Sequence, residues 1–170
     1  MTVLVCRHEA GAVWVENAQG DLVAPCFFKT AEETEADLFN EQAVVWGGVP
    51  ALLQAGFDTL VAGGVSPEVA YLECVGELKL LAELIEERGI AGMREAISNT
   101  AELGAVLGGP RIVDDALRER MAQVLEEVRA GRFAEALSRE EETGYPLLGS
   151  ERARARETQL DRTYRKLGGR

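Results

Sequence analysis

The chain has 170 residues, enough for one ordinary hydrophobic core with a small appendage. Acidic residues outnumber basic ones by 29 to 18, and a net charge of −11 would repel a nucleic-acid backbone or an anionic membrane. No apolar run approaches the roughly 20 residues of a membrane span, and the three cysteines lack zinc-type spacing. We therefore expect a soluble, cytoplasmic protein with no nucleic-acid partner, no membrane span and reduced thiols.

Residues 1–28 are β-rich and differ from the rest of the chain. Short β-type runs occupy residues 3–5, 12–15 and 22–24, and the sequence Asn-Ala-Gln-Gly-Asp at 17–21 is typical of a hairpin turn. We expect a small β-hairpin or β-arm in this N-terminal extension. A two-stranded hairpin is marginally stable alone, so it should pack on the helices or on another subunit.

Residues 29–170 have a helical pattern. Thr30 can cap a first helix that should run to about Trp46, where Gly47-Gly48 interrupts it. The predicted helices cover residues 30–46, 50–62, 66–88, 93–107 and 114–129, with two more beyond residue 131 that separate near 144–146. The sequence therefore predicts a mainly α protein.

Two pairs of acidic residues repeat one spacing. Asp37 and Glu41 are four apart in the first predicted helix, and Glu73 and Glu77 are four apart in the helix over 66–88, so each pair projects from one helix face. Each pair has apolar helical neighbours, among which ionised acids need a cation or hydrogen bonds. Oxygen ligands suit Mg²⁺ or Mn²⁺ better than zinc or copper, and two ions could share a carboxylate. On spacing alone, a solvated acidic stripe is the commoner explanation.

A series of motifs, in order over most of residues 28–168, carries a family resemblance. The motifs include Phe28-Lys29, Glu33-Thr34-Glu35, Asp37-Leu38-Phe39, Glu41-Gln42-Ala43-Val44, Gly47-Gly48-Val49, Pro67-Glu68, Glu73-Cys74, Glu77-Leu78-Lys79-Leu80, Ile97-Ser98-Asn99-Thr100-Ala101-Glu102 and Gly109-Pro110-Arg111. The series resembles the C-terminal domain of ketol-acid reductoisomerase, the acetohydroxy-acid isomeroreductase of branched-chain amino-acid biosynthesis. The resemblance implies a knotted helical domain and an intertwined homodimer.

The resemblance also implies roles for individual residues. Asp37 and Glu41 match the family's first pair of magnesium ligands, and Glu73 and Glu77 match the second pair, with one pair coming from each subunit and two Mg²⁺ ions between them. Ser98 matches the serine that contacts the substrate carboxylate. Glu77 and Ser98 are the predicted catalytic residues, Glu77 as a proton shuttle or as the partner of a substrate hydroxyl.

The predicted substrate-binding residues are Ser98, its neighbours Ile97 and Ala101, and Trp46. Trp46 stands where the family often has cysteine beside the substrate. Its indole would either reshape the pocket or fill space next to a missing domain, since aromatic side chains serve both roles.

Only about 28 residues precede the resemblance, which is too short for a nucleotide-binding βαβ unit, and no GxGxxG motif occurs. We therefore expect no NADPH binding by this chain alone. The favoured function is a Mg²⁺-dependent, NADPH-independent isomerase or lyase acting on a 2-keto or 2-hydroxy-2-keto acid such as acetolactate. The alternatives are a metal-binding subunit of a split reductoisomerase that works with a separate NADPH-binding protein, a non-catalytic keto-acid or metal-binding module, and a truncated chain that keeps only the fold.

Overall fold

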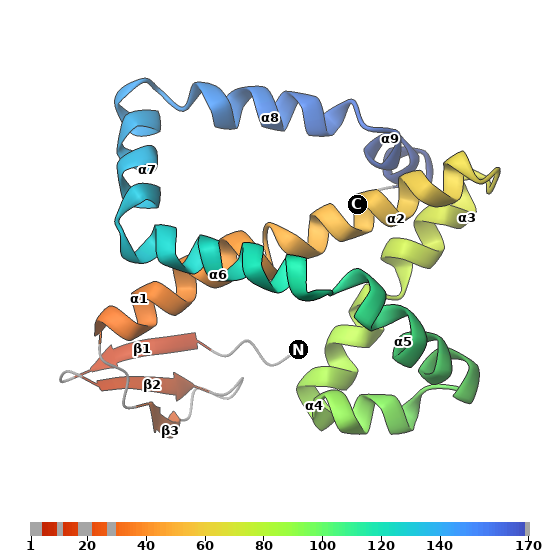
Figure 1. Ribbon diagram of the computed structural model, residues 1–170, viewed down its shortest axis with the longest axis horizontal. Helices are drawn as coiled ribbons and strands as arrows, with labels where there is room; N and C mark the ends of the chain where they lie inside the picture. The colour runs from red at the N-terminus through yellow and green to blue at the C-terminus, as the bar shows by residue number, and fades with distance from the viewer. Residues whose placement is uncertain (1–4, 10–11, 17–21, 27–29, 169–170) are drawn as a thin grey trace.

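The computed structural model of the chain describes the backbone of residues 5–9, 12–16, 22–26 and 30–168, and side chains over 31–168. A small sheet occupies the N-terminal end and helices form the remainder (Figure 1). The molecule is thus mainly helical. The hairpin turn predicted over residues 17–21 lies outside the described residues.

The strands pair side by side in an antiparallel sheet. They are β1 (Val5–Glu9), β2 (Ala12–Glu16) and β3 (Leu22–Cys26), and their spatial order in the described residues is β1-β2-β3. Valine is frequent in these segments, and β-branched side chains suit a pleated strand. The pairing of β2 with β3 is irregular between Val15 and Glu16.

The helical part contains α-helices and two π-helical turns within the described residues. The α-helices are α1 (Thr30–Phe39), α2 (Gly48–Ala62), α3 (Pro67–Tyr71), α4 (Leu78–Ala96), α5 (Asn99–Ile112), α6 (Asp115–Arg129), α7 (Arg132–Glu142), α8 (Pro146–Arg156) and α9 (Gln159–Lys166); the π turns are η1 (Asn40–Val44) and η2 (Leu72–Gly76). Side-chain oxygens of Ser98, Asp114 and Thr158 cap α5, α6 and α9 and satisfy first-turn N–H groups. Ser66 occupies the N-cap position of α3, but its side chain makes no cap hydrogen bond.

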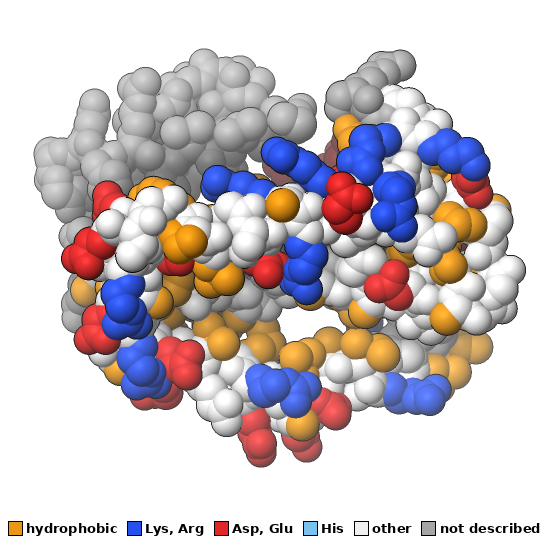
Figure 2. Space-filling model, turned by 90° about the horizontal axis from the view of Figure 1, so that it is seen from above, with side chains coloured by type: hydrophobic (Ala, Val, Ile, Leu, Met, Phe, Trp, Pro, Cys, Tyr) orange, Lys and Arg blue, Asp and Glu red, His pale blue; other side chains and the backbone are white. Residues whose placement is uncertain are grey.

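The helices from α6 to α9 form an open ring with α2 and α3 (Figure 1). After α6, the chain turns away through α7 and α8, and α9 returns to pack on α3 and α2. Lys166 of α9 pairs with Glu68 of α3, and the ring centroids of Tyr164 and Tyr71 are 6.2 Å apart. Seen from above, the molecule has an opening bordered by hydrophobic side chains (Figure 2).

Few side chains of a single chain are buried. Among residues 31–168, the buried residues are Phe57, Ala70, Val128 and Thr163. Large apolar side chains of α4 and α5 are exposed, including Leu80, Ile90 and Leu103 at about 60%.

The π turns explain why two predicted helices have the wrong bounds. The first helix does not run to Trp46, because α1 ends at Phe39 and passes into η1; the helix predicted over 66–88 is interrupted by η2. A π turn remains helical but holds an extra residue, so apolar periodicity does not reveal it. Gly89, the predicted end of this helix, has φ of 67° and ψ of 177°, which are not helical, so the predicted break is confirmed; a further helical stretch of α4 follows it and ends at Ala96.

The segment predicted as one helix over 93–107 belongs to two helices. It contains the end of α4 and the beginning of α5, separated by Ile97 in an extended conformation and by the Ser98 cap. The break predicted at 108–110 is also wrong, because α5 continues through Pro110 to Ile112.

One described stretch is apolar enough to cross a membrane by length and composition, which alone is weak evidence for a membrane span. The stretch covers residues 31–62, has a hydropathy of 1.3 in its most apolar window, and is 6% buried there. A helix that packs its apolar side on protein passes the same test. Asp58 of α2 lies within the stretch, and an ionised carboxylate in hydrocarbon is costly.

Candidate metal centre

The first carboxylate pair lies where α1 passes into η1. Asp37 is in the last turn of α1, Glu41 is the second residue of η1, and both are exposed. Within residues 31–168, neither carboxylate has a hydrogen-bond or ion-pair partner. Their oxygens are therefore available to a cation from outside the chain.

Helix α6 holds α1 and so positions the first pair. Arg129 of α6 donates to Glu35 of α1 at 3.0 Å and to Glu126 at 3.2 Å. Both hydrogen bonds raise the pKa of the Arg129 guanidinium, and the bond to Glu35 has the larger effect. The pair is exposed and adds little stability, but the neighbouring Val128 is buried and anchors the same contact.

The second carboxylate pair belongs to η2. Glu73 lies within this π turn and Glu77 follows its last residue; both are exposed and, in the described part of the chain, neither has a hydrogen-bond or ion-pair partner. Helix α2 supports η2, because a Cβ placed on Gly56 would lie 3.4 Å from Cys74 Sγ. Cys74, which the sequence predicts as a core residue, is half-buried at this contact.

The two pairs lie at different points along α2. η1 leads into α2 at Gly48, whereas Cys74 of η2 faces Gly56, which is about 12 Å farther along the helix axis at 1.5 Å per residue. Within the described residues, no three or more His, Cys, Asp or Glu side chains group as a metal site. The two carboxylate pairs therefore do not form one cluster within the described residues.

The predicted substrate-binding residues at the α4–α5 junction surround the start of α5. Ser98 is exposed, and its Oγ accepts a hydrogen bond from the Ala101 N–H at 3.2 Å. The hydroxyl still has its own proton to donate, for example to a carboxylate. Ile97 is half-buried and Ala101 is exposed. Contact of these residues with substrate remains a prediction.

Trp46 lies in the turn after η1 with 72% of its surface exposed. Among the described residues, its indole therefore fills no interior space. Nearby, an apolar groove of about 430 Å³ is formed by η1, the start of α2 and the α5–α6 junction. Val44, Leu52 and Ile112 are among its exposed lining residues.

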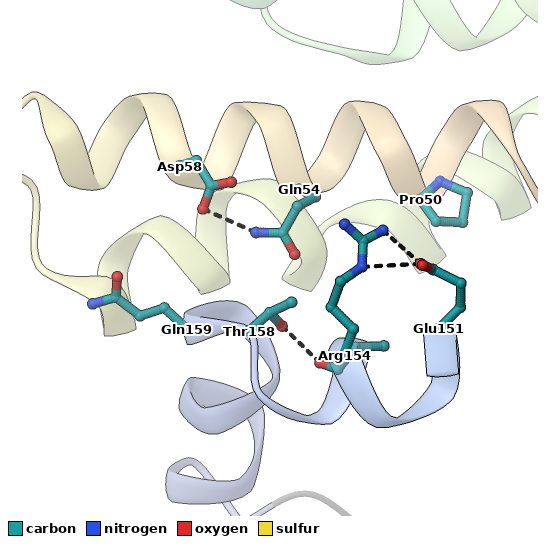
Figure 3. A pocket seen from close by; sticks show the side chains of 8 residues that line it. Pro50, Gln54, Asp58, Glu151, Arg154, Thr158 and Gln159 are labelled. Atoms are coloured by element: carbon teal, nitrogen blue, oxygen red, sulfur yellow. Dashed lines mark hydrogen bonds and ion pairs between the residues drawn. The ribbon is translucent and has the colours of Figure 1, made fainter. Parts of the chain in front are cut away.

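A second, polar cavity of about 560 Å³ lies between α2 and the α8–α9 junction (Figure 3). Gln54 donates to Asp58 at 2.9 Å, and Arg154 donates to Glu151 at 3.0 Å through its Nε. These polar groups satisfy one another, and no predicted site residue lines the cavity.

The chemistry of the four carboxylates fits a hard divalent cation. Asp37, Glu41, Glu73 and Glu77 offer only oxygen donors, which Mg²⁺ and Mn²⁺ prefer. None of the four has a cationic side chain as partner in the described residues, so no protein group competes with a metal ion. The donor set fits Mg²⁺, while each pair alone supplies too few ligands to enclose it.

Comparison with known proteins identifies the family. Residues 30–169 match the family described as ketol-acid reductoisomerase, C-terminal domain. The chain belongs to this family. Its resemblance to ketol-acid reductoisomerase, predicted from the ordered motifs, is therefore confirmed.

Two relatives illustrate the extent of the match. A ketol-acid reductoisomerase (NADP(+)) from Sulfurimonas denitrificans is 46% identical over 136 residues, which are 80% of this chain and 40% of that protein. The solved structure of an NADH-preferring ketol-acid reductoisomerase from an uncultured archaeon has a TM-score of 0.80 and 38% identity, over 82% of this chain and 42% of that one. The chain thus spans about two-fifths of the length of these relatives.

Sequence reasoning found the carboxylates but missed what positions them. The spacing of Asp37 and Glu41 is visible in the sequence, whereas the π turn between them is not. The Glu35–Arg129 and Glu68–Lys166 pairs join residues more than 90 positions apart, and no local pattern predicts such contacts. The adjacent glycines at 47–48 were the one available signal that the chain is tightly packed beside the first pair.

Proposed function

We propose that the chain is a Mg²⁺-dependent enzyme of isomerase or lyase type that acts on a 2-keto or 2-hydroxy-2-keto acid of the acetolactate kind without NADPH. One observation carries the proposal: a member of the reductoisomerase family presents two exposed carboxylate pairs, each without a partner in the described residues. The names of the two relatives state a nicotinamide cofactor. A rearrangement of this kind changes no oxidation state overall and therefore needs no hydride donor.

The proposed chemistry assigns a task to each site residue. Divalent cations, when bound, supply charge that polarises the keto and hydroxyl oxygens of the substrate. Asp37, Glu41, Glu73 and Glu77 hold two such ions, Mg²⁺ or Mn²⁺. Glu77 also accepts the substrate hydroxyl proton and returns it after the rearrangement. Ser98 donates its hydroxyl proton to the substrate carboxylate, which fixes the orientation of the acid.

The remaining predicted residues shape the substrate pocket in this proposal. Ile97 and Ala101 flank Ser98 and border the apolar end of the keto acid. The indole of Trp46 follows the first carboxylate pair and covers the site on that side, which limits the size of the substituent next to the ketone. The proposal places this chemistry in the cytoplasm.

We further propose that the complete site forms between two subunits of an intertwined, knotted homodimer. The two carboxylate pairs adjoin positions of α2 that are about 12 Å apart along the helix axis, Gly48 and Gly56, so one pair from each of two subunits would be needed to hold the ions. The exposed apolar residues of α4 and α5 also need a covering surface. In a two-fold dimer, each site takes one carboxylate pair from each subunit, so the dimer has two equivalent sites.

A turnover assay without nicotinamide tests the proposed function. Purified protein with Mg²⁺ and 2-acetolactate should form rearranged product, and removal of Mg²⁺ by a chelator should stop it. Glu73→Gln should abolish turnover, whereas Asp58→Asn, at an exposed carboxylate that bonds Gln54, should leave it unchanged. Absence of metal-dependent turnover across a panel of keto acids would contradict the proposal.

A second candidate follows from the length of the match. Because the chain covers 40% of a relative named for NADP(+), it could instead be the metal-binding subunit of a split reductoisomerase whose partner binds NADPH. Product that forms only after a separate nucleotide-binding protein is added would favour this candidate. Binding of keto acid and metal without turnover under either condition would instead indicate a non-catalytic module.

A further inference from the structure

Both carboxylate pairs are associated with π turns. Asp37 and Glu41 bracket the entry into η1, and Glu73 and Glu77 bracket most of η2. In η1 the Val45 N–H donates to the Asn40 carbonyl at 2.9 Å, an i→i−5 hydrogen bond. A π turn holds one more residue than an α turn and therefore shifts the direction of later side chains by about 100°. Glu41 is the second residue of η1, so its direction relative to Asp37 is set in part by the backbone of this π turn.

Two glycines pack directly against the carbonyls of η1. A Cβ on Gly47 would lie 1.9 Å from the Gln42 carbonyl oxygen, and a Cβ on Gly48 would lie 2.4 Å from that of Ala43. Gly47 has φ of −95°, which any residue adopts. The requirement for glycine is therefore one of space and not of backbone conformation.

The second π turn has no such contact. A Cβ on Gly76, at the end of η2, would meet only Leu72 Cδ2 at 3.9 Å, an ordinary van der Waals distance. Gly76 immediately precedes the predicted ligand Glu77. It therefore provides a matched position at which alanine fits.

We propose that Gly47 and Gly48 are positioning residues for the first half of the metal site. Their close approach to the Gln42 and Ala43 carbonyls keeps η1 in its π form and so sets the direction of the Glu41 carboxylate beside Asp37. Any larger side chain at 47 pushes the carbonyl away, because the clash is with backbone that cannot rotate aside. The inference rests on the proposed divalent-cation site, and it assigns to the glycines a role in cation affinity.

Mn²⁺ binding to the full chain, followed by the electron paramagnetic resonance signal of the free ion, tests this role. Gly47→Ala should weaken Mn²⁺ binding by about 10- to 100-fold, the usual effect of losing a group that orients a ligand. Gly76→Ala should change it by no more than about two-fold. Circular dichroism of each variant reports helical content. Equal Mn²⁺ affinities for folded Gly47→Ala and the parent chain would overturn the inference.

Gly48→Ala is the second variant if Gly47→Ala does not fold, since its clash at 2.4 Å is less severe. Amide hydrogen exchange at Val45 gives an independent readout, because its N–H makes the π-type bond to Asn40. Exchange at Val45 should accelerate in the glycine variants at 47 and 48 but not in Gly76→Ala. If the parent chain binds no Mn²⁺, the proposed metal site is wrong. Unchanged Val45 exchange in the variants at 47 and 48 would separately show that the glycines do not keep η1 in its π form.

Discussion

At the scale of single residues, the proposed site would use groups that also have a structural task. Ser98 illustrates this: its Oγ accepts from the Ala101 N–H and caps α5, while its proton is available to a substrate carboxylate. Asp114 makes the equivalent cap at the start of α6, where its carboxylate accepts from Leu117 N–H at 2.8 Å, and it has no predicted ligand. The two caps therefore allow the structural and binding tasks to be separated.

Ser98→Ala should destabilise the protein by about 1 kcal/mol through loss of the cap. It should also raise KM for the keto acid by roughly 10-fold or more, because a hydrogen bond to a charged group contributes about 1.5–3 kcal/mol. Thermal unfolding and steady-state kinetics measure the two effects. Asp114→Ala should reproduce the loss of stability with an unchanged KM; a similar rise in KM in both variants would show that Ser98 acts through α5 alone.

At the scale of elements, the contact of α9 with α3 includes the Lys166–Glu68 ion pair. Glu68 has its pKa lowered below 4.5, chiefly because Lys166 donates a hydrogen bond to its carboxylate. The folded-state pKa is thus below the unfolded one, so the contact stabilises the protein fully above pH 4.5 and loses this effect as the pH falls through the lowered pKa.

Lys166→Met should therefore lower the thermal midpoint at pH 7 and have progressively less effect as the pH falls through the lowered pKa of Glu68, because Glu68 is then protonated in both proteins. Thermal unfolding of parent and variant at several pH values measures the difference. Lys79→Met, which breaks the Lys79–Glu83 pair within α4, provides a matched surface control. A difference between parent and Lys166→Met that stays constant with pH would exclude Glu68 as its source.

Elements with strong local signals were predicted from the sequence. Asp114 and the amphipathic pattern after it place α6 within a residue of its observed bounds, Asp115–Arg129. The continuation of α1 into η1 was not predictable, because the extra residue of a π turn leaves helical hydrogen bonding in place. The contact of Gly47 with the Gln42 carbonyl depends on the folded path of the turn, so the glycine could be interpreted only as a helix break.

At the scale of the whole molecule, the proposed dimer would complete both the hydrophobic core and the metal site of each chain. The buried residues of one chain are few, its α4 and α5 faces are apolar and exposed, and its carboxylate pairs remain apart. The motifs predicted the four ligands and the family, but the distance between the pairs follows from the packing of both π turns on α2. Assembly and metal binding should therefore be linked.

Mixing two defective variants tests whether the pairs of different subunits combine. One variant carries Asp37→Asn with Glu41→Gln, and the other carries Glu73→Gln with Glu77→Gln. Each alone should bind no Mn²⁺ at the shared site. Refolded together in equal amounts, they should regain about one quarter of the parent's sites, since about half of the dimers are mixed and each has one intact site.

Free-ion measurements by electron paramagnetic resonance count the bound Mn²⁺ in the mixture. Two copies of the same defective variant, refolded in the same way, are the control and should bind none. Failure of the mixture to recover binding, with dimers present in sedimentation, would show that a site does not draw one pair from each subunit.

Helix α2 contacts both η1 and η2. In the proposed dimer, the carboxylate pairs at its two contacts serve different metal centres, so this helix joins one centre to the other within each subunit. If metal binding at one centre shifts η1, α2 passes the shift to η2 and so changes the metal affinity of the other centre. By thermodynamic linkage, binding at the second centre changes the affinity of the first by the same factor. Metal loading of the dimer should accordingly be cooperative, and its isotherm should depart from that of two independent sites.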